Sequence, residues 1–217
     1  MTYLWQTALM TLIATFAAYL VGLPTGVLLN ITSKKGIKPC KWINIPLGII
    51  VNILRSVPCL ILVVIFIPLT RNIFGIGIGE WYTILIPLFV TAFGFVARMV
   101  EQSLQEVPVG EIEAIKSLGA SNWQLITKVL LPESRSSLIS SAAVTTVAIL
   151  GYTSFAANIG AGGLIHGIWM AYRSNPTDFL NCWYFWVLLG LVVLIVQGVQ
   201  ELGLYVSKKI DKRRITK

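Results

Sequence analysis

Residues 113–132, EAIKSLGASNWQLITKVLLP, form an amphipathic, partly charged stretch inside a chain that is otherwise strongly apolar. The mean hydropathy of the chain is +0.79. Only 12% of its 217 residues are charged, against about 25% in soluble proteins. So few charges cannot cover a water-facing surface. The composition therefore predicts an integral membrane protein in which residues 113–132 are a polar island.

Long segments without charge surround the island. Residues 1–33, 136–172 and 179–200 contain no Asp, Glu, Lys or Arg. About 18 or more apolar residues are enough to cross the hydrocarbon core as a helix. We predict an all-α polytopic membrane protein, with residues 1–217 forming a single transmembrane domain and a polar loop at 106–132. Five transmembrane helices are expected, at about 4–31, 43–69, 81–99, 138–158 and 182–206.

The basic residues predict how the chain lies in the membrane. Lys34 is the first of them, so the first segment lacks the positive n-region of a signal peptide and is expected to remain as a helix. Of the 17 Lys and Arg residues, 14 lie at 32–42, 98–136 and 208–217, on one side of a five-span arrangement. The positive-inside rule makes that side cytoplasmic and places the N-terminus outside and the C-terminus in the cytoplasm. This distribution favours a lipid bilayer over nucleic acid as the reason for the net charge of +8.

The sequence indicates no site for a metal or a nucleotide. Cys40, Cys59 and Cys182 do not have the spacing of metal ligands, and His166 has no cluster of ligands around it. The glycine-rich stretch at 160–163 lacks the Lys and Ser or Thr of a phosphate-binding loop. We expect no cofactor and no catalytic residue in this chain.

The polar loop predicts two short helices separated by a break. Pro108 suits a first helical position, and apolar residues recur at every third position over 109–118. Gly119 is typical of a helix end, while Ser121 and Gln124 have the spacing of a capping box that starts a second helix. Amphipathicity alone leaves two interpretations open: the loop packs against its own spans, or it is a docking surface.

The spacing within the loop resembles the EAA motif of bacterial ABC importer permeases, E-A-A-x3-G-x9-I-x-L-P. Ile115 replaces the third small residue and Val129 replaces the Ile. The resemblance implies the type I ABC importer permease fold, in which a short coupling helix inserts into a cleft on a cytoplasmic ATPase subunit. The residues that it assigns to coupling are Glu113, Ala114, Ile115, Gly119, Ala120, Leu131 and Pro132.

The stretches at 51–58, 97–101 and 151–163 are similar to those of the methionine-uptake permease subfamily. This closer resemblance implies a permease for methionine or a related amino acid in the bacterial cytoplasmic membrane. It also implies three kinds of partner: a second copy of the chain, two ATPase subunits that hold ATP and Mg²⁺, and an extracellular substrate-binding lipoprotein. A permease for another amino acid remains an alternative.

Arg55 is the charge expected deepest inside a span. A charge at the centre of a helix costs about 2.5–3.5 kcal/mol on insertion scales, so it should face protein or water. Asn52, Ser56 and Pro58 flank it. In one interpretation these four residues belong to the translocation pathway, where Arg55 attracts a substrate carboxylate or sets a helix bend. In the other, Arg55 bonds to carbonyls freed near Pro58 or to another span.

The remaining candidate residues lie at the ends of the third and fourth spans. Arg98 and Glu101 are three residues apart and are predicted to form an ion pair that bridges the third span and the polar loop. Tyr152 and Phe155 are candidates for the pathway, where the resemblance places Phe155 at a gate, and ordinary packing is the alternative. Structural roles are expected for Gly160, Gly162 and Gly163.

Two other functional classes are less well supported. An ion-coupled secondary transporter usually carries Asp, Glu or His within its spans and has internal repeats. A membrane-embedded enzyme needs paired carboxylates, a nucleophile with a base, or metal ligands. No Asp or Glu falls in the core of a predicted span.

Overall fold

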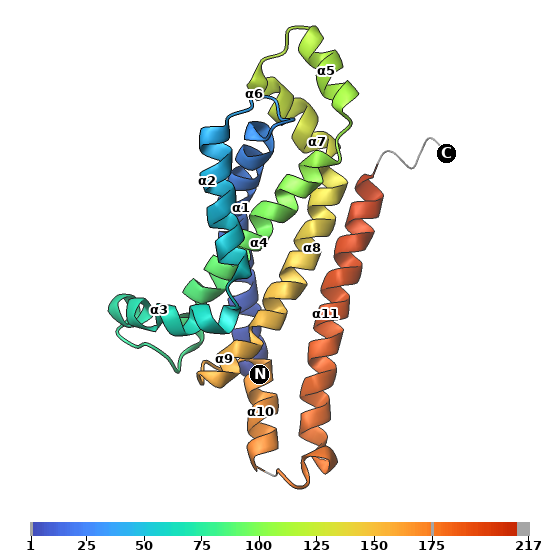
Figure 1. The fold of residues 1–217 in the computed structure, drawn as a ribbon. Coiled ribbons are helices and arrows are strands. Elements are labelled where there is room, and N and C mark those ends of the chain that lie inside the picture. The colour runs from blue at the N-terminus through green and yellow to red at the C-terminus, as the bar shows by residue number, and fades with distance from the viewer. Residues whose placement is uncertain (1, 175, 212–217) are drawn as a thin grey trace.

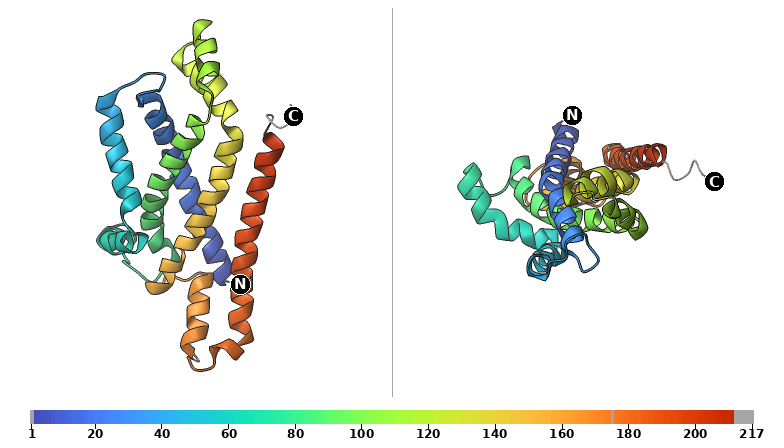
Figure 2. Two further views of the ribbon diagram at one scale, coloured as in Figure 1. Left: turned by 45° about the vertical axis from the view of Figure 1, so that its right-hand side comes forward. Right: turned by 90° about the horizontal axis from the view of Figure 1, so that it is seen from above.

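The structure is a computed structural model that describes residues 2–174 and 176–211, and every regular element in that part of the chain is a helix (Figures 1 and 2). The elements are α1 (Thr2–Thr32), α2 (Lys41–Ser56), α3 (Cys59–Phe74), η1 (Trp81–Ile84), α4 (Leu85–Gln105), α5 (Val109–Ser117), α6 (Asn122–Leu125), η2 (Ile126–Leu130), α7 (Leu131–Glu133), α8 (Arg135–Tyr152), α9 (Ser154–Asn158), α10 (Leu164–Ser174), η3 (Phe179–Asn181) and α11 (Trp183–Ile210). Four helical segments are long and apolar enough to cross a membrane, at 2–32, 81–105, 135–158 and 183–210.

The segment expected to be one continuous span at 43–69 is instead two helices. The axes of α2 and α3 differ by 101°, and the break lies at Val57 and Pro58. Val57 is extended, as a residue before proline prefers to be, and Pro58 has no N–H to continue the helix. The break at Pro58 therefore divides the segment that the sequence predicts as one span. The count of five holds only if the bent pair is counted as one span.

The contact between α1 and α4 is the most extensive between any two elements in the described part of the chain. Small residues allow it: a Cβ added at Gly26 of α1 would lie 2.5 Å from the carbonyl oxygen of Ala97 on α4. A Cβ added at Gly22 would lie 2.6 Å from the side chain of Val96 on α4. Helices in membranes associate through such close packing, because lipid provides little hydrophobic drive between them. The centre of the core is therefore the α1–α4 interface.

The other helices surround this pair. α8 packs against both α4 and α11. α11 lies at the edge of the bundle, and only 6% of its most hydrophobic stretch is buried. The two ends of the bundle differ, as Figure 1 shows: α5 and α6 project at one end, and α10 with the start of α11 extends at the other. The polar loop of the sequence thus forms one end of the molecule.

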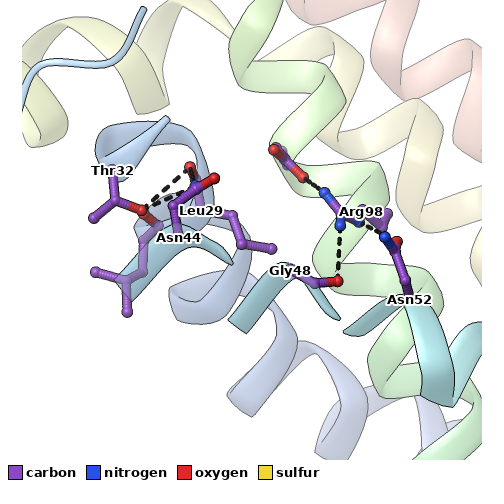
Figure 3. A network of polar contacts seen from close by, with 8 residues as sticks. Leu29, Thr32, Asn44, Gly48, Asn52 and Arg98 are labelled. Atoms are coloured by element: carbon purple, nitrogen blue, oxygen red, sulfur yellow. Dashed lines mark hydrogen bonds and ion pairs between the residues drawn. The ribbon is translucent and has the colours of Figure 1, made fainter. Parts of the chain in front are cut away.

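Arg98 joins α2 to α4 near the polar-loop end (Figure 3). Its Nε donates to Asn52 Oδ1 at 3.1 Å and its Nη2 donates to the Gly48 carbonyl at 3.0 Å, both on α2. Its Nη1 pairs with Glu101, which is only 8% exposed. The predicted Arg98–Glu101 pair is confirmed. The further hydrogen bonds of Arg98 go to α2 and not to the polar loop, so the pair is a clamp between α2 and α4.

Replacing Gly26 with Leu should destabilise the α1–α4 interface, because the new side chain would meet the Ala97 carbonyl and Val100. Overpacking of this kind costs about 1–3 kcal/mol. We expect a lower midpoint of thermal unfolding in detergent. Gly190→Leu on α11 is the matched control, since nothing lies within 4 Å of a Cβ there. Equal stability of the two variants would contradict the close α1–α4 contact.

Replacing Arg98 with Met should destabilise the protein by leaving the Glu101 carboxylate unpaired in a mostly buried position. An unsatisfied buried group costs about 1–3 kcal/mol. The double variant Arg98→Met with Glu101→Met removes both charges and should recover part of the loss. Thermal unfolding of the three proteins measures this coupling. A double variant that loses the sum of the two single losses would rule out an energetic pair.

Candidate functional site

The loop between α4 and α8 contains the predicted helix–break–helix. α5 ends at Ser117, and Gly119 follows with a φ of +83°, a backbone conformation that glycine adopts without strain. Ser121 then caps α6: the Gln124 N–H donates to Ser121 Oγ at 3.3 Å, and the Ser121 N–H donates to Gln124 Oε1 at 2.8 Å. The predicted glycine break and capping box are both confirmed.

Large apolar side chains of this loop are exposed. Val109 is 57%, Leu118 86% and Trp123 73% exposed, whereas Ile112 packs on the central core. The sequence pattern predicts one apolar side over 109–118, but in the structure Ile112 faces the core whereas Val109 and Leu118 are exposed. Exposed apolar residues on a polar segment are typical of a surface that another protein covers. We call Val109, Leu118 and Trp123 the exposed apolar residues of the loop.

The residues predicted to couple to an ATPase lie in two places. The outer group is on α5 and in the turn after it: Glu113, Ala114 and Gly119 are exposed, and Ile115 and Ala120 are half-buried. The inner pair, Leu131 and Pro132, is half-buried in α7 at the base of the loop, where Leu131 packs on the central core. The loop therefore has an exposed tip and an anchored base.

A π-helix, η2, forms the base of the loop. The Leu131 N–H bonds to the Ile126 carbonyl, five residues earlier, and Leu125, Val129 and Leu130 are buried. π-helical turns are rare and occur frequently at functional sites. Leu130 belongs to the central core, and Ile126 and Leu131 pack on it, so the base of the loop is joined to the bundle.

Serine hydroxyls connect the three helices next to this base. Ser103 of α4 lies 3.0 Å from Ser141 and 3.1 Å from Ser137, both on α8 (Oγ–Oγ). Ser136 of α8 donates to the Ser207 carbonyl of α11 at 3.1 Å, and Ser207 Oγ donates back to the Ser136 carbonyl at 2.8 Å. This serine cluster was not among the predicted features. The signal for it was the i, i+4 spacing of Ser137 and Ser141 on a helix expected to cross the membrane.

An open groove of about 610 Å³ lies at the bend between α2 and α3. Three of the predicted pathway residues, Asn52, Ser56 and Pro58, line it, together with Val57 and aliphatic side chains of both helices. Ser56 Oγ donates to the Asn52 carbonyl at 2.7 Å. The groove is thus mainly aliphatic, with one amide and one hydroxyl in its lining.

Arg55 does not line this groove. Its side chain is exposed and makes no ion pair or side-chain hydrogen bond with any residue in 2–174 or 176–211. The pairing with carbonyls near Pro58 is therefore not seen within the chain. The role of Arg55 in the pathway stays a prediction.

The other predicted residues lie at the end of the bundle opposite the loop. Tyr152 and Phe155 are half-buried against the central core, in keeping with packing. The glycine turn at 160–163 is fastened to the start of α1: the Gly163 N–H donates to Gln6 Oε1 at 3.0 Å and the Leu164 N–H to Thr7 Oγ1 at 2.8 Å. Gly160, Gly162 and Gly163 all have positive φ, which explains the glycines at these positions.

No group of three or more His, Cys, Asp or Glu side chains that could hold a metal ion occurs among residues 2–174 and 176–211.

The sequence of this chain matches a family model and several known proteins. The model of the family described as "binding-protein-dependent transport system inner membrane component" matches residues 22–211. A Vibrio cholerae protein described as "Probable D-methionine transport system permease protein MetI" is 38% identical over 98% of this chain and 92% of its own length. The Escherichia coli K12 "D-methionine transport system permease protein MetI" is 43% identical over 69% of each chain.

Solved structures of ABC transporters have the same fold. A chain from the inward-facing MetNI methionine ABC transporter matches with a TM-score of 0.88 and 36% identity over 97% of this chain and 95% of that one. A chain of an amino acid ABC transporter crystallised with histidines, at 18% identity and a TM-score of 0.77, shares the fold alone. The match over residues 22–211 and the near full-length similarity to permeases show that this chain belongs to the family of inner membrane components of binding-protein-dependent transport systems.

Proposed function

We propose that this chain is the membrane-spanning subunit of an ABC importer for methionine or a closely related amino acid. Its relatives are described as D-methionine transport permeases, and its fold matches that of a methionine ABC transporter chain. The observation that carries the proposal is the exposure of three large apolar side chains in the polar loop, those of Val109, Leu118 and Trp123.

The loop tip is the proposed docking surface for a cytoplasmic ATPase subunit. An amphipathic helix that lies in a groove is a common mode of protein recognition, and its apolar residues act as anchors. Gly119 has a φ of +83°, which permits the sharp turn between α5 and α6. The small, exposed side chain of Ala114 allows a partner to approach the helix closely. In this arrangement ATP and Mg²⁺ are held by the ATPase, and this chain is non-catalytic.

Force applied to the tip would pass into the spans through the anchored base. Ile126, Leu130 and Leu131 join the loop to the core, and the serine cluster holds α4 and α8 together beside it. The helices on both sides of the loop would therefore move as one body. Such rigid-body movement is one of the established forms of switching between two conformations.

The groove at the α2–α3 bend is the proposed half of a translocation pathway. It is open on one side, so a second copy of the chain would be needed to close it. Its aliphatic walls, with Asn52 and Ser56 among the lining residues, suit an amino acid that has an apolar side chain. The loop end would then be cytoplasmic, and the opposite end, with the N-terminus, would face an external substrate-binding lipoprotein.

An ion-coupled secondary transporter is the alternative function. It would need an intramembrane carboxylate available to bind a cation. Glu101 is connected to the groove residue Asn52 through Arg98, and its carboxylate is already paired with Arg98. No observation in the described residues favours this alternative over the importer.

Replacing Gly119 with Val should uncouple ATP hydrolysis from transport. A β-branched residue at a φ of +83° is strained by about 1–3 kcal/mol, so the turn between α5 and α6 would change shape. We expect uptake into vesicles containing the importer complex to fall several-fold relative to ATP hydrolysis. Gly110→Val is the control, because Gly110 lies in α5 without a positive φ. Unchanged uptake in the Gly119 variant would argue against the coupling role.

Replacing Leu118 with Ser should weaken binding of the ATPase subunit. Loss of an apolar anchor that becomes buried in the complex raises a dissociation constant about tenfold or more. The measurement is the affinity of the purified chain for its ATPase subunit. Leu180→Ser is the matched control, since Leu180 is 57% exposed but lies in the connection between α10 and α11, at the end away from the loop. A loss of affinity equal in both variants would contradict docking at the loop tip.

A further inference from the structure

A pocket of about 440 Å³ lies between the end of α1 and the start of α2. Its lining includes Thr32, Lys34, Cys40, Lys41, Asn44 and Ile45. It lies at the same end of the bundle as α5 and α6 (Figure 1). The proposed function does not use it, because the loop tip and the α2–α3 groove are formed by other residues.

Two lysines, Lys34 and Lys41, line the pocket, and its lining contains no carboxylate. Four lysines lie within 34–41, and the sequence has no Asp or Glu before Glu80. Within residues 2–174 and 176–211 none of these lysines forms an ion pair. Lys41 is the first residue of α2, where the helix dipole disfavours a cation, and Cys40 provides no side-chain cap. Both the ammonium groups and the uncapped helix end would therefore be stabilised by an anion.

The walls of the pocket are held in place by hydrogen bonds. The loop after α1 folds back on it, with the Lys38 N–H donating to the Ile31 carbonyl at 3.1 Å and the Cys40 N–H to the Thr32 carbonyl at 3.0 Å. From α2, Asn44 Nδ2 donates to the Leu29 carbonyl at 2.8 Å and to Thr32 Oγ1 at 3.1 Å (Figure 3). The backbone that carries the lysines is thus ordered before any ligand binds, which reduces the entropic cost of binding.

Apolar side chains adjoin the basic residues. Trp42 is 91% exposed and Ile45 is 55% exposed, on the first turns of α2. Tryptophan is typical of the level of lipid headgroups. A free phosphate would use the lysines but not these two side chains. A ligand that joins a phosphate to acyl chains would use both.

We propose that this pocket binds the headgroup of an anionic phospholipid. Lys34, Lys41 and the start of α2 contact the phosphate, and Trp42 and Ile45 contact the glycerol and acyl region. Basic pockets between transmembrane helices are known to bind anionic headgroups. The positive-inside rule explains why lysines lie at this end, but it does not require an ordered pocket or an uncapped helix start.

The test uses the full chain in a mild detergent, with phosphatidylglycerol or phosphatidylcholine added and the bound lipid counted by native mass spectrometry. We expect selective binding of phosphatidylglycerol. The double variant Lys34→Gln with Lys41→Gln should weaken it about thirtyfold, from the contribution of two basic residues near a lipid surface. The control is Lys208→Gln with Lys209→Gln, which removes two charges at the end of α11 outside the pocket. The control should retain binding.

Two results would overturn the proposal. The first is an equal loss of phosphatidylglycerol in the pocket variant and the control, which would indicate attraction to the net charge alone. The second is full displacement of the lipid by inorganic phosphate at millimolar concentration, which would identify the ligand as a free anion. Because lipid binding is measured on the chain alone, either result leaves the transport assays of the proposed importer unaffected.

Discussion

The structure depends on the close approach of α4 to α1 and α2. Cβ atoms at Gly22 or Gly26 would collide with α4, and one at Gly94 of α4 would lie 3.2 Å from the Val51 carbonyl on α2. In a bilayer, backbone proximity of this kind supplies the packing that water-driven burial supplies in soluble proteins. Because α4 also contacts α3 and α8, it is the helix through which the bundle is joined. The polar loop begins directly after it.

The position of α4 relates the loop to the groove. At its loop end, Ser103 bonds to α8, so the two helices that flank the loop are fixed to each other. About one turn earlier, Arg98 bonds to Gly48 and Asn52 of α2, and Asn52 lines the groove. A displacement of the loop base thus has a continuous route of packed and hydrogen-bonded groups to the proposed pathway. Such a route of contacts is a physical basis for coupling between the loop and the pathway.

Much of this architecture could be predicted from the sequence, because composition and local chemistry determine it. Charge-free segments located the spans, and the capping box at Ser121 and the stop at Gly119 are local signals that the structure confirms. The 101° bend at Pro58 was not predictable in size, since the apolar run continues on both sides of it. The serine cluster and the Arg98–Asn52 bond were missed because they join residues far apart in the chain, which only tertiary packing brings together.

The central claim is that transport is driven by a partner that binds the loop and hydrolyses ATP. The most direct measurement is amino acid uptake into vesicles that contain the purified chain, with and without its ATPase subunit and ATP. Binding protein and substrate are present throughout. The account predicts uptake only when the ATPase and ATP are both supplied, and none with a proton or sodium gradient alone. Uptake by the chain alone, driven by an ion gradient, would contradict it.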